Sequence, residues 1–216
     1  GIVGLGNVGS RLATMAKLLG WQVIAYDPFA NRDHVTQVEF KQLLQQADAI
    51  SIHVPLTKTG QHPTYHLFNA TTLAEMKPNA ILINSARGPV IAEADLMQDI
   101  RNTNRTVVLD VFEHEPEISS ELLELLALAT PHIAGYSLEG KARGTQMIYE
   151  AFCQVFAQAA TKRFETQLPN CEQYFAQADF KTVLTQHLNQ IYDIAQDDAN
   201  LRACVKQGKV EQQAFD

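Results

Sequence analysis

The feature that most constrains the fold of this chain is a glycine-spaced turn near its beginning. Gly4, Gly6 and Gly9 follow the apolar residues Ile2 and Val3 with the spacing G-x-G-x-x-G. Between a strand and a helix, the first glycine permits a tight reversal and the second lets the backbone approach a pyrophosphate. The third allows the helix to pack closely on the strand. A fold rarely begins on so demanding a turn, so we expect the chain to be a piece of a longer protein.

The residues after the turn support a nucleotide-binding unit. Apolar residues recur at helical spacing: Val8, Leu12, Met15, Ala16 and Leu19. Gly20 follows as a helix stop, and the next apolar run, 21–27, ends at Asp27. A dinucleotide fold needs a carboxylate at this position for the adenosine ribose hydroxyls. Because a carboxylate repels a 2′-phosphate, Asp27 favours NAD over NADP. Two alternatives stay open: Asp27-Pro28 can simply end the strand, and Arg32 could accept a phosphate.

The residues up to 135 alternate short apolar runs with helical segments, which is typical of parallel β-α-β units. The expected strands are 21–27, 49–54, 80–84, 106–110 and 132–134, and the expected helices are 40–47, 72–76, 93–101 and 120–126. These strands are apolar throughout, as in a sheet covered on both faces. We therefore predict an α/β fold with a Rossmann-type doubly wound parallel sheet.

The pattern changes after Gly135. A long helix is expected over 138–160, then a polar connector over 161–179 with Pro169-Asn170 at its centre, and a further helix over 180–194. We predict a nucleotide-binding domain over 1–136, a crossover helix over 137–164, and a linker with the beginning of a small C-terminal domain over 165–216.

Composition narrows the function classes. The 216 residues carry a net charge of -7, which argues against nucleic acid and acidic membrane surfaces as partners. No apolar run is long enough to span a bilayer. Cys153, Cys171 and Cys204 lack metal-ligand spacing, and no histidine pair has a metal signature, so we predict no metal site. An anionic substrate would need a locally basic pocket.

Three polar residues lie at or just beyond the expected carboxyl ends of strands, where open α/β sheets bind ligands. Arg87 follows the strand 80–84, Glu115 lies in the segment 110–116, and His132 opens the last expected strand. An arginine can hold a substrate carboxylate or carbonyl at two points. A histidine oriented by a carboxylate can take a hydroxyl proton while a hydride leaves the neighbouring carbon. Each also has a structural interpretation, as a cap, a solvated loop acid or a packed histidine.

Five segments resemble the successive signatures of the D-2-hydroxyacid dehydrogenases: 4–9, 53–56, 84–88, 110–116 and 130–135. The run 131–145 is the most specific part of the likeness, and it resembles members that act on a phosphorylated acid. The resemblance implies NAD as cofactor, a phosphorylated 2-hydroxyacid as substrate, a homodimer and the bacterial cytoplasm. It also implies a substrate domain ahead of residue 1, a return to it through the helix over 137–164, and a C-terminal dimerisation domain.

The resemblance assigns roles residue by residue. Arg87 would orient the substrate carboxylate, and Glu115 would pair with His132, the proton acceptor in oxidation. Tyr136 would touch substrate. The implied cofactor contacts are Gly4, Gly6, Asn7, Val8 and Gly9 at the pyrophosphate, Asp27 at the ribose, and Val54, Ser85, Ala86, Asp110 and Gly135 on the nicotinamide side.

Several points stay open. Val54 stands where some family members have a hydroxyl residue, so a contact there would use its backbone or methyl groups. Lys141 and Arg143 could attract a phosphorylated acid or be surface charges. The alternative substrates are other phosphorylated 2-hydroxyacids, 3-phosphoglycerate first. A different class of function, an NAD-sensing binding protein, would need no proton relay, so Arg87, Glu115 and His132 together speak against it.

Overall fold

The computed structural model describes residues 1–30, 32–168, 179–188, 192–206 and 209–210. They form two compact units, Gly1–Pro131 with Tyr192–Asp216, and His132–Ile191. The first segment of the first unit ends at Pro131, whereas we placed the end of the nucleotide-binding domain at 136. The same unit also includes the residues from Tyr192 onward, which we assigned to the C-terminal part. Pro169-Asn170 and Cys171 lie outside the described residues.

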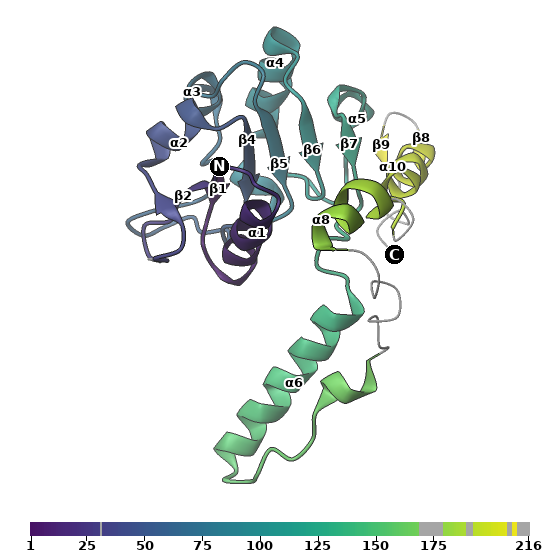
Figure 1. Ribbon diagram of the computed structural model, residues 1–216. Coiled ribbons are helices and arrows are strands. Elements are labelled where there is room, and N and C mark those ends of the chain that lie inside the picture. The colour runs from purple at the N-terminus through teal and green to yellow at the C-terminus, as the bar shows by residue number, and fades with distance from the viewer. Residues whose placement is uncertain (31, 169–178, 189–191, 207–208, 211–216) are drawn as a thin grey trace. The chain divides into compact units, whose positions relative to one another are not determined.

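The first unit is built on a seven-stranded, all-parallel sheet in the order β3-β2-β1-β4-β5-β6-β7 (Figure 1). The strands are β1 Ile2–Val3, β2 Ile24–Tyr26, β3 Thr36–Gln37, β4 Ala49–Ile52, β5 Ile81–Asn84, β6 Val107–Leu109 and β7 Leu128–Ala129. The predicted doubly wound α/β fold is confirmed. The order reverses between β1 and β4, and a reversal of this kind opens a ligand crevice at the carboxyl ends of the strands.

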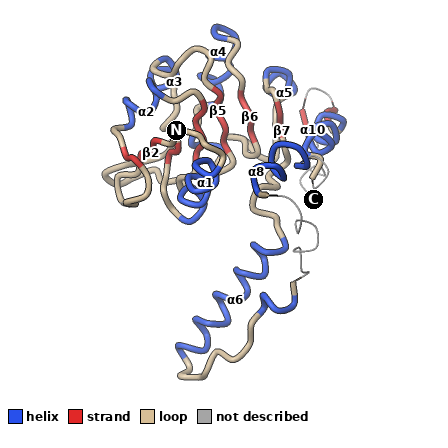
Figure 2. Tube along the Cα trace, in the orientation of Figure 1, coloured by secondary structure: helices blue, strands red, loops and turns tan. Residues whose placement is uncertain are grey.

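Except between β2 and β3, a helix separates each strand from the next along the chain (Figure 2). The helices are α1 Asn7–Leu18, α2 Phe40–Gln46, α3 Ala70–Ala74, α4 Glu93–Thr103 and α5 Ser120–Leu125, with a short 3-10 turn over Gly88–Val90. The chain runs from β1 through β2 to β3 in one direction, then crosses to β4 on the other side of β1 and continues to β7. Right-handed crossovers therefore place α1 on one face of the sheet and α2 to α5 on the other.

The larger of two core clusters fills the space between the sheet and the helices α2 to α5, and a smaller one lies under α1. The fully buried members of the larger cluster include Ile50, Ile52 and Leu82 from strands and Leu43, Leu73, Leu96 and Leu122 from helices. Each such side chain contributes about 1.5–3 kcal/mol through burial. The buried Arg105 guanidinium joins two of the helices, because it donates to Asp99 at 2.7 Å and to the carbonyls of Leu73 and Lys77.

The expected last strand, 132–134, is wrong. The strand lies four residues earlier, where Leu128 pairs with Val108 and Ala129 with Leu109. Pro131 has no N–H for a ladder, and the φ angle of His132 is +58°, outside the extended region. His132 therefore lies beyond the carboxyl end of β7 rather than in a strand.

The predicted first helix is present as α1, and its larger apolar side chains are partly exposed. Val8 is 64% exposed and Met15 is 39% exposed. The buried positions of α1 are the small residues Gly9, Ala13 and Ala16, which let the helix lie close to the sheet.

Helix α10, Ile194–Ala203, returns to the first unit and packs beside β7. The Asp198 carboxylate accepts the Ala129 N–H at 2.7 Å and the Arg202 Nε at 2.9 Å. Arg202 also donates to the carbonyls of Leu123 and Leu126 at the end of α5. Leu201, 1% exposed, joins the core. A two-stranded hairpin follows, β8 Val205–Lys206 and β9 Lys209–Val210.

The second unit contains α6, Leu138–Val155, which begins at the Ser137 cap. Ala157 has a φ of +50°, so α6 ends before the expected 160. The described part of this unit leaves apolar side chains of α6 exposed: Met147, Ile148, Phe152 and Val155. Short helical turns follow, η2 Phe164–Gln167 and α8 Phe180–Thr182, the latter continuing as a π-helix over Val183–His187. Among the described residues, no helix is long and apolar enough to cross a membrane.

Candidate functional site

The glycine turn after β1 has the space that an anion needs. A side chain on Gly4, whose φ is +97°, would come within 2.5 Å of the His53 carbonyl, and one on Gly9 within 2.0 Å of the Gly4 carbonyl. Nothing lies within 4 Å of the same position on Gly6. Gly6, Asn7 and Val8 are exposed, and no side chain caps the start of α1. The helix therefore presents its first N–H groups and positive dipole end to a phosphate.

Asp27 lies directly against this turn. Its Oδ2 accepts the Leu5 N–H at 2.7 Å, and its Oδ1 accepts the N–H groups of Phe29 and Ala30, each at 2.9 Å. Asp27 follows the last residue of β2 and holds the glycine turn through these hydrogen bonds. This position is compatible both with a contact to the ribose and with a role in ending the strand. Arg32 reaches the same turn, with its Nε 3.4 Å from the Leu5 carbonyl. A ribose contact of Asp27 stays a prediction.

The loop after β4 carries Val54, which is half-buried and packs against the core. The His53 N–H donates to the Val3 carbonyl at 2.7 Å, which joins this loop to β1. His53 Nε2 lies 2.8 Å from Ser51 Oγ, and burial lowers the pKa of His53. His53 thus supports the backbone beside the glycine turn.

Arg87 is exposed in the loop after β5. Buried Asn84 shapes that loop, because its Oδ1 accepts the Ala86 N–H and its Nδ2 donates to the Arg87 carbonyl, both at 3.0 Å. Arg87 Nη1 donates to the Ala86 carbonyl at 2.6 Å. Ser85 and Ala86 are half-buried beside it.

Glu115 lies in the loop after β6, where its Oε1 accepts the Phe112 N–H at 2.6 Å. Asp110 begins this loop, is 6% exposed and accepts the Thr130 hydroxyl at 2.6 Å. A side chain on Gly88 would lie 1.8 Å from the Phe112 carbonyl. The structure therefore brings the loop of Arg87 and the loop of Glu115 into direct backbone contact.

His132, Gly135 and Tyr136 belong to the second unit, all exposed in the described chain. The Lys141 ammonium lies 3.5 Å from the centroid of the Tyr136 ring. A pairing of His132 with Glu115 stays a prediction. Within the described residues, no three His, Cys, Asp or Glu side chains gather as a metal site.

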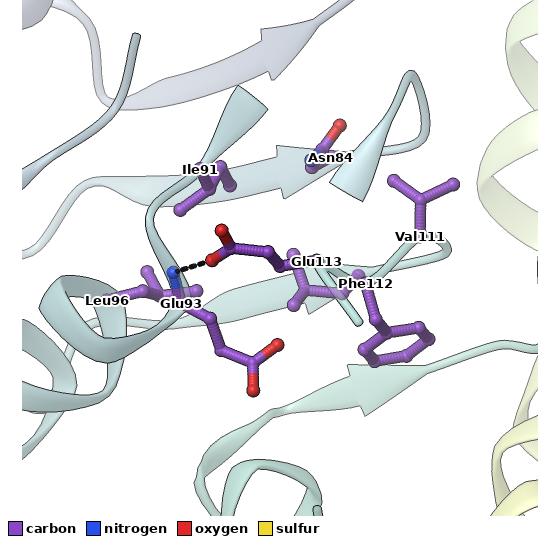
Figure 3. A pocket seen from close by; sticks show the side chains of 8 residues that line it. Asn84, Ile91, Glu93, Leu96, Val111, Phe112 and Glu113 are labelled. Carbon is purple, nitrogen blue, oxygen red and sulfur yellow. Dashed lines mark hydrogen bonds between the residues drawn. The ribbon is translucent and has the colours of Figure 1, made fainter. Parts of the chain in front are cut away.

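The sequence did not point to Glu113, which lies in a small cavity between α4 and the loop after β6 (Figure 3). Its carboxylate contacts His66 at 2.5 Å and the Glu93 N–H at 2.8 Å. Burial acts to raise the pKa of Glu113, but the hydrogen bonds from Glu93 and His66 hold that pKa below its ordinary value. Burial raises the pKa of the neighbouring Glu93 carboxyl. The only sequence signal was the place of Glu113 in the segment 110–116.

The sheet order and the glycine turn together define a dinucleotide-binding domain of the doubly wound class. Residues 1–134 match the family model described as D-isomer specific 2-hydroxyacid dehydrogenase, NAD binding domain. The chain belongs to this family, and its cofactor is NAD.

The curated relatives carry a more specific name. Proteins called erythronate-4-phosphate dehydrogenase are 71% identical in Acinetobacter baumannii and 64% identical in Acinetobacter baylyi, in each case over all 216 residues. One from Psychrobacter cryohalolentis is 46% identical and also covers the whole chain. The chain spans 61%, 61% and 60% of the length of these relatives.

Solved structures agree on the fold. D-lactate dehydrogenase from Aquifex aeolicus, complexed with NAD and lactic acid, has a TM-score of 0.61 and 30% identity, covering 71% of this chain and 52% of that one. The holo form of D-mandelate dehydrogenase from Rhodotorula graminis has a TM-score of 0.58 and 30% identity, covering 64% and 42%.

Proposed function

We propose that this chain is the cofactor-binding part of an erythronate-4-phosphate dehydrogenase. The protein would oxidise 4-phospho-D-erythronate to (R)-3-hydroxy-2-oxo-4-phosphooxybutanoate, a step of pyridoxal 5′-phosphate synthesis. The observation that carries this proposal is the 71% identity over all 216 residues to relatives of that name. Identity of this extent over the whole chain supports a shared substrate as well as a shared fold.

The glycine turn supports the cofactor part of the proposal. The exposed N–H groups at Asn7 and Val8 would hold the pyrophosphate, and Asp27 would accept the ribose hydroxyls. Val54, Ser85, Ala86, Asp110 and Gly135 would line the nicotinamide side. NAD, when bound, supplies the acceptor for the hydride that leaves C2 of the substrate.

The loops at the carboxyl ends supply the other groups. Arg87 would bind the carboxylate of the 2-hydroxyacid at two points, which fixes C2 toward the cofactor. His132, oriented by Glu115, would take the proton of the C2 hydroxyl as the carbonyl forms. Tyr136 would contact substrate, and Lys141, stacked on its ring, would face the phosphorylated end.

The first test is NADH formation by the full-length protein that contains this chain. It is offered 4-phospho-D-erythronate, 3-phosphoglycerate and unphosphorylated D-2-hydroxyacids in parallel. We expect a strong preference for the erythronate ester and its loss in Arg87→Ala. Arg101→Ala, which removes an exposed arginine paired with Glu121 on the surface, is the matched control.

The outcomes separate the alternatives. Preference for 3-phosphoglycerate would keep the family and change the substrate. No turnover with any of these acids, together with normal NAD binding, would favour the NAD-sensing alternative. A His132→Ala variant should lose turnover and keep NAD binding if the protein is an enzyme.

The same resemblance supports a homodimer in the bacterial cytoplasm. The segment 165–216 would lead into the dimerisation domain. Sedimentation of the full-length protein checks the dimer, and a monomer would refute it.

A further inference from the structure

The Glu113 carboxylate contacts two other parts of the chain, and Figure 3 shows the hydrogen bond that it accepts from the Glu93 N–H. It extends from the loop after β6, which carries Glu115. One oxygen lies 2.5 Å from Nε2 of His66, in the segment that follows β4. The other accepts the N–H of Glu93, the first residue of α4, at 2.8 Å. One side chain thus connects three parts of the chain that are far apart in sequence.

The segment of His66 is itself bonded to the loop of Arg87. The His66 N–H donates to the Pro89 carbonyl at 2.9 Å, and the Phe68 N–H donates to the Val90 carbonyl at 3.0 Å. Gly88 in the same loop presses against the Phe112 carbonyl. The contacts close a ring in which the loops of Arg87 and Glu115 are held to each other directly and through His66 and Glu113.

His66 adopts a left-handed backbone conformation, which is uncommon for residues other than glycine. Its φ is +51°, in the left-handed region where glycine is the usual residue. The imidazole has two partners. The Tyr65 ring stacks on it with the ring centroids 3.9 Å apart, and the Glu113 carboxylate contacts its Nε2. The side-chain contacts therefore offset a backbone cost that a glycine would not incur.

Glu113 also serves α4 as a cap from another part of the fold. The residue before the helix, Ala92, has no side chain that could accept its first N–H groups. A carboxylate at this position satisfies the Glu93 N–H and interacts favourably with the helix dipole. The Glu113 side chain is 13% exposed, so water screens these contacts weakly.

We infer that His66 and Glu113 are a positioning pair for the proposed dehydrogenase reaction. They hold the loops of Arg87 and Glu115 in register, so that Arg87, which would bind the substrate carboxylate, and Glu115, which would orient the proton relay, act on the same substrate. This inference rests on the proposed function. Neither residue needs to touch substrate or cofactor, and both act through Arg87 and Glu115.

The kinetic test uses the full-length protein with His66→Gly, Glu113→Gln and the double variant. His66→Gly removes the imidazole and relieves the left-handed backbone, so the fold is retained. Displacement of reacting groups by about 1 Å lowers turnover about 100-fold, so we expect kcat for the preferred hydroxyacid to fall about 10- to 100-fold. The KM for NAD should stay within about twofold, because the glycine turn is left unchanged. The double variant should be no slower than the slower single one, since the two residues act as a unit.

Two matched variants control for general effects. Asn104→Gly relieves the same kind of backbone conformation, φ +56°, at the other end of α4. Glu121→Gln breaks a surface ion pair with Arg101. Both should retain the kcat of the unmodified protein. Unchanged kcat in His66→Gly and Glu113→Gln, or an equal loss in the controls, would overturn the inference.

Hydrogen exchange separates failure of this inference from failure of the proposed function. The Phe112 amide, which is bonded to the Glu115 carboxylate, reports the position of Glu115. Its exchange should become at least about tenfold faster in His66→Gly and Glu113→Gln and stay unchanged in Asn104→Gly. If the unmodified protein turns over none of the acids, the proposed function fails. Exchange of the Phe112 amide then decides by itself whether His66 and Glu113 position the loop of Glu115. Faster exchange then supports the positioning pair, and unchanged exchange refutes it.

Discussion

At the scale of single residues, Gly6 and Gly9 belong to one turn but have different surroundings. A methyl group on Gly6 meets nothing within 4 Å, whereas one on Gly9 would overlap the Gly4 carbonyl at 2.0 Å. We expect Gly6→Ala to keep the unfolding free energy and to weaken NAD binding about tenfold, because the methyl group would stand where the phosphate approaches. Gly9→Ala should destabilise the fold by about 2–3 kcal/mol.

Calorimetric NAD titration and urea unfolding of both variants check this expectation. Gly20→Ala is a useful comparison, because Gly20 also has open surroundings but a φ of +83°. Gly20→Ala should lower the unfolding free energy, because alanine is strained at this φ, and should leave NAD affinity unchanged. Equal NAD affinity of Gly6→Ala and the unmodified protein would argue against the phosphate at this turn.

The carboxylates around α4 predict a pH dependence of stability. The pKa of Glu113 is lowered in the folded protein, so its stabilisation is present above its unfolded pKa of about 4.3 and is lost as the pH falls through the folded value. Glu93 acts in the opposite sense. Burial raises its pKa, so ionisation of Glu93 costs stability as the pH rises through its folded value. His66 and His114 lie near Glu113, and both act to lower its pKa.

Urea unfolding between pH 7 and pH 3 should therefore show a smaller acid loss of stability in Glu113→Gln than in the unmodified protein. Glu93→Gln should gain stability relative to the unmodified protein as the pH rises, because it removes a half-buried carboxyl whose pKa burial raises. Identical pH slopes for Glu113→Gln and the unmodified protein would contradict the role assigned to Glu113.

At the scale of elements, α10 is held by polar contacts more than by an apolar face. Asp198 bonds both the Ala129 N–H and Arg202, which in turn binds two carbonyls of α5. Removing the carboxylate leaves the Arg202 guanidinium without its acid, so Asp198→Ala should lower the unfolding free energy by about 1–3 kcal/mol. Exchange of the Ala129 amide should also become faster. Asp197→Ala, which removes only an exposed contact to Tyr192, should change neither quantity.

The elements also show what a single sequence can predict. Strands β4, β5 and β6 are continuous apolar runs, so their positions followed directly from the sequence. The run at 132–134 is equally apolar, but Pro131 and the left-handed His132 exclude it from the sheet. Helix α10 was missed because it is held by Asp198 and Arg202. These side chains bond backbone groups of β7 and α5 that are distant in sequence, and hydrophobic periodicity does not reveal such contacts.

The placement of the candidate loops was predictable to a similar degree. Arg87 and Glu115 follow strands that the apolar pattern located, so their loops could be expected at one edge of the sheet. The supporting contacts could not be predicted. That Gly88 touches Phe112, or that Glu113 reaches His66, depends on how loops 20 or more residues apart fold against each other.

At the scale of the whole molecule, the chain corresponds to 61% of its relatives' length. We expect the isolated chain to bind NAD through the first unit and to turn over little or no 4-phospho-D-erythronate. The physical reason is that residues 1–134 match an NAD binding domain, and the proposed enzyme would bind its substrate with the help of a separate substrate domain. NAD titration and NADH formation, measured on the chain and on the full-length protein, check this. Robust turnover by the isolated chain would contradict it.

The position of α10 has a practical consequence for the boundaries of any shortened form. β7 is the last strand of the sheet, and the carboxylate of Asp198 occupies the Ala129 N–H on that strand. A protein cut after Pro131 would expose this N–H on an open sheet edge, and such edges recruit strands from other molecules. A minimal cofactor-binding domain should therefore retain residues 192–203, or it will self-associate through β7.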